Sequence, residues 1–142
     1  MDNKKYKPAS ILLVEDDDID AMSVQRAFSR MKIANPIVRA KDGIEALEIL
    51  LQGAIEQPYL ILLDLNMPRM GGLELLNTIR NNPQLELSVI FVLTTSKDDE
   101  DKIKAYKHHV AGYIVKESLD EGFEQLVQML DHYWRLVELP VV

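Results

Sequence analysis

Four short runs of apolar residues divide the chain, and none of them alternates apolar with polar positions. The runs span residues 11–14, 60–63, 89–93 and 113–115. A sheet with one face in water would show alternation, whereas unbroken apolar runs are typical of strands covered on both faces, as in a parallel sheet. A weaker fifth run over residues 37–40 contains Arg39, and its shortness and charge favour an edge position.

The stretches between these runs have the spacing of amphipathic helices. In three of them apolar residues recur at intervals of three and four, which matches one face of a helix. These stripes consist of Val24, Ala27, Phe28 and Met31, then Ala46, Leu47, Leu50 and Leu51, and finally Phe123, Leu126, Val127 and Leu130.

Two shorter patterns predict the remaining helices. Leucine and isoleucine over residues 73–79 predict a short helix that Pro83 cannot continue. A sparser stripe of Ile103, Tyr106 and Val110 follows four consecutive acidic residues. Negative charge before a stripe favours a helix N-terminus, because it complements the helix dipole.

Two polar pairs mark predicted helix starts. Asp42 with Glu45, and Ser118 with Glu121, have the spacing of capping boxes. The order is therefore strand then helix, repeated five times. It predicts an α/β fold, a doubly wound five-stranded parallel sheet with five helices over its two faces. In such a sheet the ligand site lies beyond the carboxyl ends of the strands.

Composition and charge narrow the class of protein. The 142 residues suit one domain over 1–142 with an N-terminal tail over 1–9, and 47% of them are hydrophobic, as in globular chains. The net charge of −7 argues against a nucleic-acid partner, and no run approaches the roughly 18 apolar residues of a membrane span. The lack of cysteine excludes disulfides and cysteine nucleophiles. We expect a small, soluble, cytoplasmic domain with no membrane partner.

Polar side chains gather at the ends of the predicted strands. The first strand ends in Glu15 and Asp16, the third in Asp64, the fourth in Thr94 and the fifth in Lys116. Taken singly, the acids have an ordinary interpretation as helix caps or turn residues, and a lone Thr or Lys at a strand end carries almost no signal. Carboxylates that converge at one edge, however, repel one another unless a hard cation with oxygen ligands shares them. Asp16 and Asp64 would then flank Mg²⁺, with room for an incoming phosphoryl group.

These residues carry a resemblance to the receiver domains of two-component response regulators. The resemblance covers nearly the whole chain, with the motifs in that family's order. The matching motifs are Leu12-Leu13-Val14-Glu15-Asp16, the run from Leu62 to Gly72 around Asp64, then Thr94, and Gly112-Tyr113-Ile114-Val115-Lys116. It implies a flavodoxin-like receiver fold with strand order 2-1-3-4-5.

The resemblance also implies a role for the acidic residues. Asp64 would accept a phosphoryl group from a phosphohistidine of a sensor histidine kinase. Mg²⁺ would be held by Glu15, Asp16 and Asp64, with Asp16 as a direct ligand. The backbone carbonyl of Asn66 would be a further ligand. Phosphoryl transfer depends mainly on positioning and charge neutralisation, which such a set of ligands supplies.

Further roles follow from the same resemblance. Lys116 would pair with the phosphoryl group, Thr94 would donate a hydrogen bond to it, and Tyr113 would move with Thr94 as a switch, although strand packing alone explains Tyr113 equally well. The chain also departs from the family twice. Glu117 follows Lys116 where a proline is common, and since a cis peptide bond there would cost ~3–4 kcal/mol, we expect a trans bond or a reshaped loop. Thr95 replaces a small residue, and its bulk would slow hydrolysis of the phosphoaspartate.

Two rival interpretations stay open. A Mg²⁺-dependent phosphatase of the haloacid-dehalogenase type also uses an aspartate nucleophile, but it needs a second Asp two residues later, where this chain has Asn66. A degenerate receiver would be an interaction module without phosphorylation, although every motif position is filled. We expect a phosphoacceptor signalling protein, not an enzyme, which assists its own phosphorylation and dephosphorylation.

The C-terminal extension, residues 135–142, follows Trp134 and is rich in apolar side chains. With the run Leu93-Thr94-Thr95-Ser96 it resembles the small single-domain regulators of phytochrome-type sensor kinases. We expect no output domain, and a homodimer through the fourth helix, fifth strand, fifth helix and this extension, because a contiguous apolar patch usually marks a contact site. The alternative is that the extension folds back on its own domain or is disordered.

Overall fold

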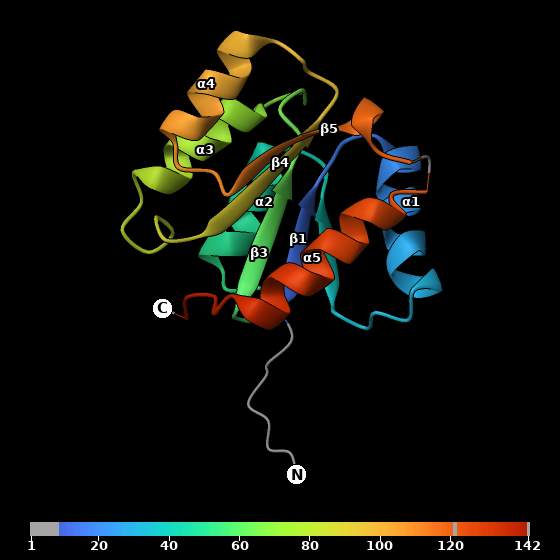
Figure 1. Ribbon diagram of the computed structural model, residues 1–142. Coiled ribbons are helices and arrows are strands. Elements are labelled where there is room, and N and C mark those ends of the chain that lie inside the picture. Colours follow the sequence, from blue (N-terminus) through green and yellow to red (C-terminus); the bar gives the residue numbers. More distant parts are fainter. Residues whose placement is uncertain (1–8, 121, 142) are drawn as a thin grey trace.

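The computed structural model of the protein describes residues 9–120 and 122–141. These residues form five strands, five α-helices and one 3₁₀ turn in alternating order (Figure 1). The elements are β1 Ser10–Val14, α1 Asp18–Arg30, β2 Ile37–Ala40, α2 Gly43–Leu51, β3 Tyr59–Leu63, α3 Gly72–Arg80, β4 Val89–Thr94, α4 Asp99–Lys107, β5 Gly112–Val115, the 3₁₀ turn η1 Lys116–Ser118, and α5 Glu124–Leu136.

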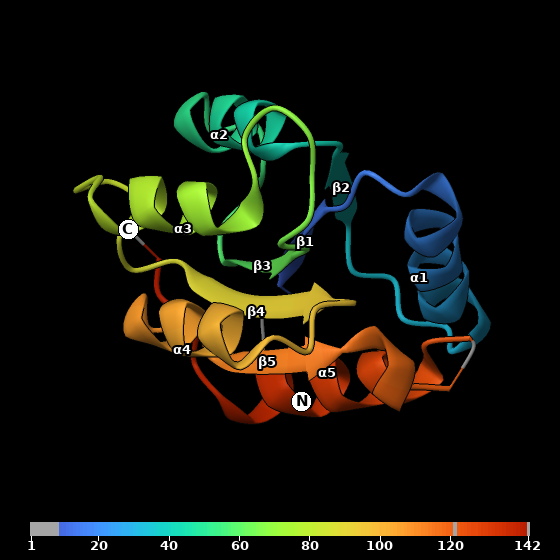
Figure 2. The same ribbon diagram turned by 90° about the horizontal axis from the view of Figure 1, so that it is seen from above.

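The five strands are all parallel and lie in the order β2-β1-β3-β4-β5. The predicted fold class and strand order are confirmed, including the edge position of β2. Helices α1 and α5 cover one face of the sheet, and α2, α3 and α4 cover the other (Figures 1 and 2). No helix within residues 9–120 and 122–141 combines the length and apolarity needed to cross a membrane.

Burial on both faces explains why the strand sequences are apolar without interruption. In β1, Leu12 and Val14 pack into the core under α2 and α3, while Ile11 and Leu13 pack into the core under α1 and α5. All four side chains are almost fully buried. Of the predicted N-terminal tail only Ala9 is described, and it is buried beside β1.

Helices α1 and α2 begin at the carboxyl edge with aspartate caps. The Asp17 carboxylate accepts the N–H groups of Ile19 and Asp20 at the start of α1. Asp42 caps α2 by accepting the Glu45 N–H, as its position in the sequence predicts. The Glu45 carboxylate accepts from the N–H of Lys41 and not from that of Asp42.

The predicted start of the fifth helix at Ser118 is wrong. Ser118 ends the 3₁₀ turn η1, and α5 begins at Glu124 after Phe123, which has a positive φ of 60°. The Asp120 carboxylate accepts the N–H groups of Glu124 and Gln125 and so performs the capping that the pattern assigned to Ser118. Glu121, the other half of the predicted box, lies outside the described residues.

The sparse stripe of the fourth helix is mostly not buried. Ile103 is 55% exposed and Tyr106 is 49% exposed, and Val110 lies beyond the end of α4. Ala105 is the residue of this helix that packs into the core. Because successive helical residues point about 100° apart, a contact through Ala105 turns Ile103 and Tyr106 outward.

Candidate functional site

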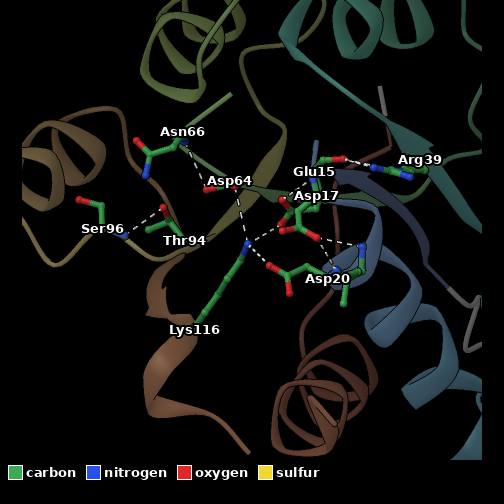
Figure 3. A network of polar contacts seen from close by, with 10 residues as sticks. Glu15, Asp17, Asp20, Arg39, Asp64, Asn66, Thr94, Ser96 and Lys116 are labelled. Atoms are coloured by element: carbon green, nitrogen blue, oxygen red, sulfur yellow. Dashed lines mark hydrogen bonds and ion pairs between the residues drawn. The ribbon is translucent and has the colours of Figure 1, made fainter. Parts of the chain in front are cut away.

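Four strand ends bring polar side chains together at the carboxyl edge of the sheet (Figure 3). Glu15 follows β1, Asp64 follows β3, Thr94 ends β4, and Lys116 follows β5. Glu15, Asp16 and Asp64 can each offer a carboxylate oxygen, and these oxygens lie within 4.8 Å of one another. The arrangement therefore assembles the acids, the hydroxyl and the ammonium that the sequence analysis located at the strand ends.

The acids differ in their exposure and hydrogen bonds. Glu15 and Asp64 are buried, whereas Asp16 is exposed. The N–H of Asn66 donates to Asp64 Oδ1 at 3.3 Å, and the N–H of Asp17 donates to Glu15 Oε2 at 3.2 Å. The two buried carboxylates thus accept hydrogen bonds from backbone N–H groups, whereas Asp16 is the one of the three acids that is exposed to solvent.

Lys116 lies between the acids at the centre of Figure 3. Its Nζ donates to Glu15 Oε1 at 2.7 Å and to Asp20 Oδ2 at 2.7 Å, and it lies 3.7 Å from Asp64 Oδ2. Within the described chain the cis peptide bond is Gln57–Pro58, so the bond from Lys116 to Glu117 is trans, as expected. The ammonium therefore reaches Asp64 without the proline that the family commonly has there.

The cluster carries more negative than positive charge. Burial raises the pKa of Glu15 above its ordinary value, against the hydrogen bond from Lys116, and the charge of Asp64 raises this pKa further. Burial by itself lowers the pKa of Lys116, but hydrogen bonds to Asp20 and Glu15 outweigh burial and raise it. Lys116 thus stays protonated, and a divalent cation with oxygen ligands would relieve the remaining repulsion.

Two contacts fix the loop that follows Asp64. A side chain on Gly72 would place its Cβ 2.5 Å from the Asp64 carbonyl oxygen, so this close approach requires glycine. Arg69, at a positive φ of 60°, donates from Nε to Asp42 Oδ2 at 2.6 Å. Since Asp42 also caps α2, the loop and that helix hold each other in place.

Thr94 and Tyr113 meet through Ser96 in the loop between β4 and α4. The Ser96 N–H donates to Thr94 Oγ1 at 3.3 Å, and the Tyr113 hydroxyl donates to the Ser96 carbonyl at 3.0 Å. The Ser96 hydroxyl in turn donates to Asp101 of α4. A displacement of Thr94 would therefore reach both Tyr113 and α4. The neighbouring Thr95 is exposed.

Two residues at the site were not singled out from the sequence as part of it. Asp20 binds Lys116 from the first turn of α1, where a helical side chain tilts back toward the N-terminus and so toward the strand ends. Arg39, which the sequence analysis used only as an edge marker, donates from Nε and Nη2 to the Glu15 carbonyl and pairs with Asp18. The backward tilt of side chains near a helix start was the available signal for Asp20.

Comparisons with known proteins agree with this geometry. The family model described as response regulator receiver domain matches residues 11–131. The response regulator Rcp1 of Synechocystis sp. is 37% identical over 145 residues, which cover 99% of both chains.

The solved structures that are similar over nearly the whole chain include the following two. That of the phosphorylated cyanobacterial phytochrome response regulator RcpA has a TM-score of 0.85 at 33% identity, over 95% of this chain and 100% of its own. The Mn²⁺-bound form of Rcp1 has a TM-score of 0.80 at 36% identity, over 94% and 100%.

Proposed function

This chain belongs to the response regulator receiver domains, and from that premise we propose that Asp64 accepts a phosphoryl group from a phosphohistidine of a sensor histidine kinase. The observation that carries the proposal is the cluster of three carboxylates within 4.8 Å, with the Lys116 ammonium 3.7 Å from Asp64. The protein is a signalling protein, and it acts by changing its contacts with other proteins once phosphorylated.

The donor set fits a hard divalent cation. Three carboxylates converge with a single ammonium between them, and oxygen ligands are those that Mg²⁺ prefers. We assign Asp16 and Asp64 as direct ligands, Glu15 as an acid that holds a metal-bound water, and the Asn66 carbonyl as a further ligand. When bound, Mg²⁺ would neutralise charge between the acids and the phosphoryl oxygens. Rcp1, which is similar to this chain, has been solved with Mn²⁺.

In the transfer itself, an Asp64 carboxylate oxygen forms a bond to phosphorus. The bond from phosphorus to the donor's imidazole nitrogen breaks, and its electron pair returns to that nitrogen. Lys116 lies close enough to Asp64 to pair with a phosphoryl oxygen, and Thr94 ends the neighbouring strand with its hydroxyl at the same edge. Because Lys116 and Thr94 are held in position, they stabilise the negative charge on the transferred phosphoryl group, and this is the main requirement of phosphoryl transfer.

The switch is carried by the contacts around Ser96. If Thr94 shifts to donate its hydroxyl to a phosphoryl oxygen, the Ser96 N–H that donates to Thr94 Oγ1 has to shift with it. Ser96 also receives the Tyr113 hydroxyl and bonds Asp101 at the start of α4. The chemistry at Asp64 is thereby coupled to Tyr113 and α4.

The partner is a sensor histidine kinase of the phytochrome type. RcpA, one of the most similar solved structures, is a phytochrome response regulator. Because such a kinase takes its phosphoryl group from ATP, we place the phosphoryl transfer in the cytoplasm.

The protein also forms a homodimer, in which its exposed apolar side chains become buried. Ile103 and Tyr106 are exposed on α4, and Leu136 at the end of α5 is 83% exposed. The extension contributes less than its sequence suggests, because Trp134, just before it, is buried and Leu139 packs against its own domain. The pairing surface therefore consists of α4, β5, the end of α5 and Val137 and Val141 of the extension.

Labelling with acetyl phosphate and Mg²⁺ tests the proposal against its rivals. A receiver incorporates up to one phosphoryl group per chain, and Asp64→Asn incorporates none. Repeated turnover of acetyl phosphate would instead indicate a phosphatase. Neither turnover nor label would indicate a degenerate receiver. Mass spectrometry of the intact chain reads the stoichiometry directly.

A further inference from the structure

Lys116 has a second carboxylate partner that the motif residues do not include. Its ammonium has three N–H donors, and two of them bind Glu15 and Asp20 at the same distance of 2.7 Å. The Asp64 carboxylate lies farther away, at 3.7 Å. Two of the three donors are thus used by Glu15 and Asp20, and at 3.7 Å Asp64 forms an ion pair with the ammonium but no hydrogen bond.

Asp20 stands apart from the acids that could share a cation. The group of carboxylates whose oxygens lie within 4.8 Å of one another consists of Glu15, Asp16 and Asp64. Asp20 comes from the first turn of α1, where its own N–H is capped by Asp17 Oδ1 at 3.0 Å. Its side chain is 29% exposed, while that of Lys116 is 9% exposed. Asp20 is therefore a fixed acceptor beside the cation group and outside it.

The backbone conformation near Lys116 does not by itself fix the position of its ammonium group. Lys116 opens the short turn η1 after the half-buried edge strand β5, and five side-chain bonds with four torsion angles separate its Cα from Nζ. Contacts across 101 residues to Glu15 and 96 residues to Asp20 hold the ammonium in place. If the Glu15 carboxylate binds a metal-bound water instead, Asp20 remains as the hydrogen-bond acceptor that holds the Lys116 ammonium.

We propose that Asp20 is a positioning residue for phosphoryl transfer, which holds the Lys116 ammonium beside Asp64 with one N–H free for a phosphoryl oxygen. The inference rests on the proposed role of Asp64. Without Asp20, the ammonium moves toward the Asp64 carboxylate and blocks the carboxylate oxygen that must attack phosphorus. Small displacements of a positioning group have large effects on transfer rates.

The test is a double-mutant cycle between Asp20 and Lys116, read as the initial rate of labelling by acetyl phosphate at saturating Mg²⁺. Asp20→Ala should slow labelling by about tenfold. Its effect should vanish in a Lys116→Ala background, because Asp20 acts through Lys116. Asp20→Asn, which keeps an oxygen acceptor in place, should recover most of the rate. Final labelling should still approach one phosphoryl group per chain.

Asp18→Ala is the matched control, since it removes another acid from the same helical turn whose partner is Arg39. It should label within about twofold of the original chain. Circular dichroism checks folding, and Asp20→Ser, whose hydroxyl is too short to reach Nζ, repeats the cycle if the alanine variant does not fold.

Three results would overturn the inference while leaving Asp64 as the acceptor: an unchanged rate in Asp20→Ala, an equal slowing in both lysine backgrounds, or no recovery in Asp20→Asn. A chain that is not labelled at all would overturn the function and the inference together. Normal labelling of the Asp64→Asn variant would also overturn both.

Discussion

Single residues at the carboxyl edge differ in what they contact, and mutations at them should therefore have different effects. Asp64 is buried among like charges, with Lys116 at 3.7 Å. Asp64→Asn should abolish labelling and leave the fold intact. In metal-free protein it should slightly raise the free energy of unfolding, because one repelling carboxylate is lost. Urea titration and intact mass measure the two effects, and full labelling of this variant would remove Asp64 from the proposed role.

Asp16 and Glu15 should differ in how much they contribute to metal affinity. Asp16 is exposed, whereas Glu15 is buried and already accepts a hydrogen bond from Lys116. Asp16→Ala should weaken Mg²⁺ binding by more than about tenfold, because a direct ligand is lost. Glu15→Ala should weaken it less. Calorimetric titration gives both constants. Equal weakening would contradict the ranking.

At the scale of elements, the loop between β4 and α4 should separate chemistry from response. Thr94 contacts Ser96, which contacts both Tyr113 and Asp101, while Asp64 and Lys116 lie on other strand ends. Thr94→Ala should therefore still be labelled but should lose the change in association that phosphorylation produces. Intact mass and sedimentation of the labelled protein measure the two properties. A normal response in this variant would rule out coupling through Thr94.

The start of α2 should give a pH-dependent contribution to stability. The hydrogen bond from Arg69, followed by that from the Glu45 N–H, holds the pKa of Asp42 below its ordinary value of 3.8. A carboxyl group with a lowered pKa stabilises the fold above its unfolded pKa, and the contribution is lost as the pH falls through its folded pKa.

Asp42→Ala should accordingly lower the free energy of unfolding by about 1 kcal/mol at neutral pH, as the loss of a helix cap does. The difference between the two proteins should shrink as the pH falls below 3.8. Denaturant titrations at several pH values measure it. Arg69→Gln, which keeps the cap but removes the main cause of the lowered pKa, should reduce both the pH dependence and the stability at neutral pH. A difference that grew in acid would contradict this account.

At the scale of the whole molecule, the exposed residues of α4 and the C-terminal extension should mediate self-association. Sedimentation should show a dimer for the full chain and a weaker dimer for a chain that ends after Val137. The cut has to follow Trp134, which is 4% exposed and stacks on Phe28 of α1. Ile103→Glu should dissociate the dimer. Monomers at high concentration, with and without phosphorylation, would show that no such interface exists.

The arrangement of the fold and the location of its candidate site could be predicted from the sequence. A strand buried on both faces must be apolar throughout, which marked β1, β3, β4 and β5, and the carboxyl ends of parallel strands must share one edge. These two rules are local or topological, so Asp64 and Lys116 could be assigned to one site although 52 positions separate them.

Tertiary structure alone decided which side chains meet. Asp20 and Lys116 are 96 residues apart, and their contact depends on where the first turn of α1 lies relative to the turn η1 that follows β5. The same holds for Asp120 replacing Ser118 as the cap of α5, for Ile103 turning outward, and for Trp134 turning into the core. A periodic pattern shows that a helix has an apolar face, but the packing of neighbouring elements decides which residues of that face are covered.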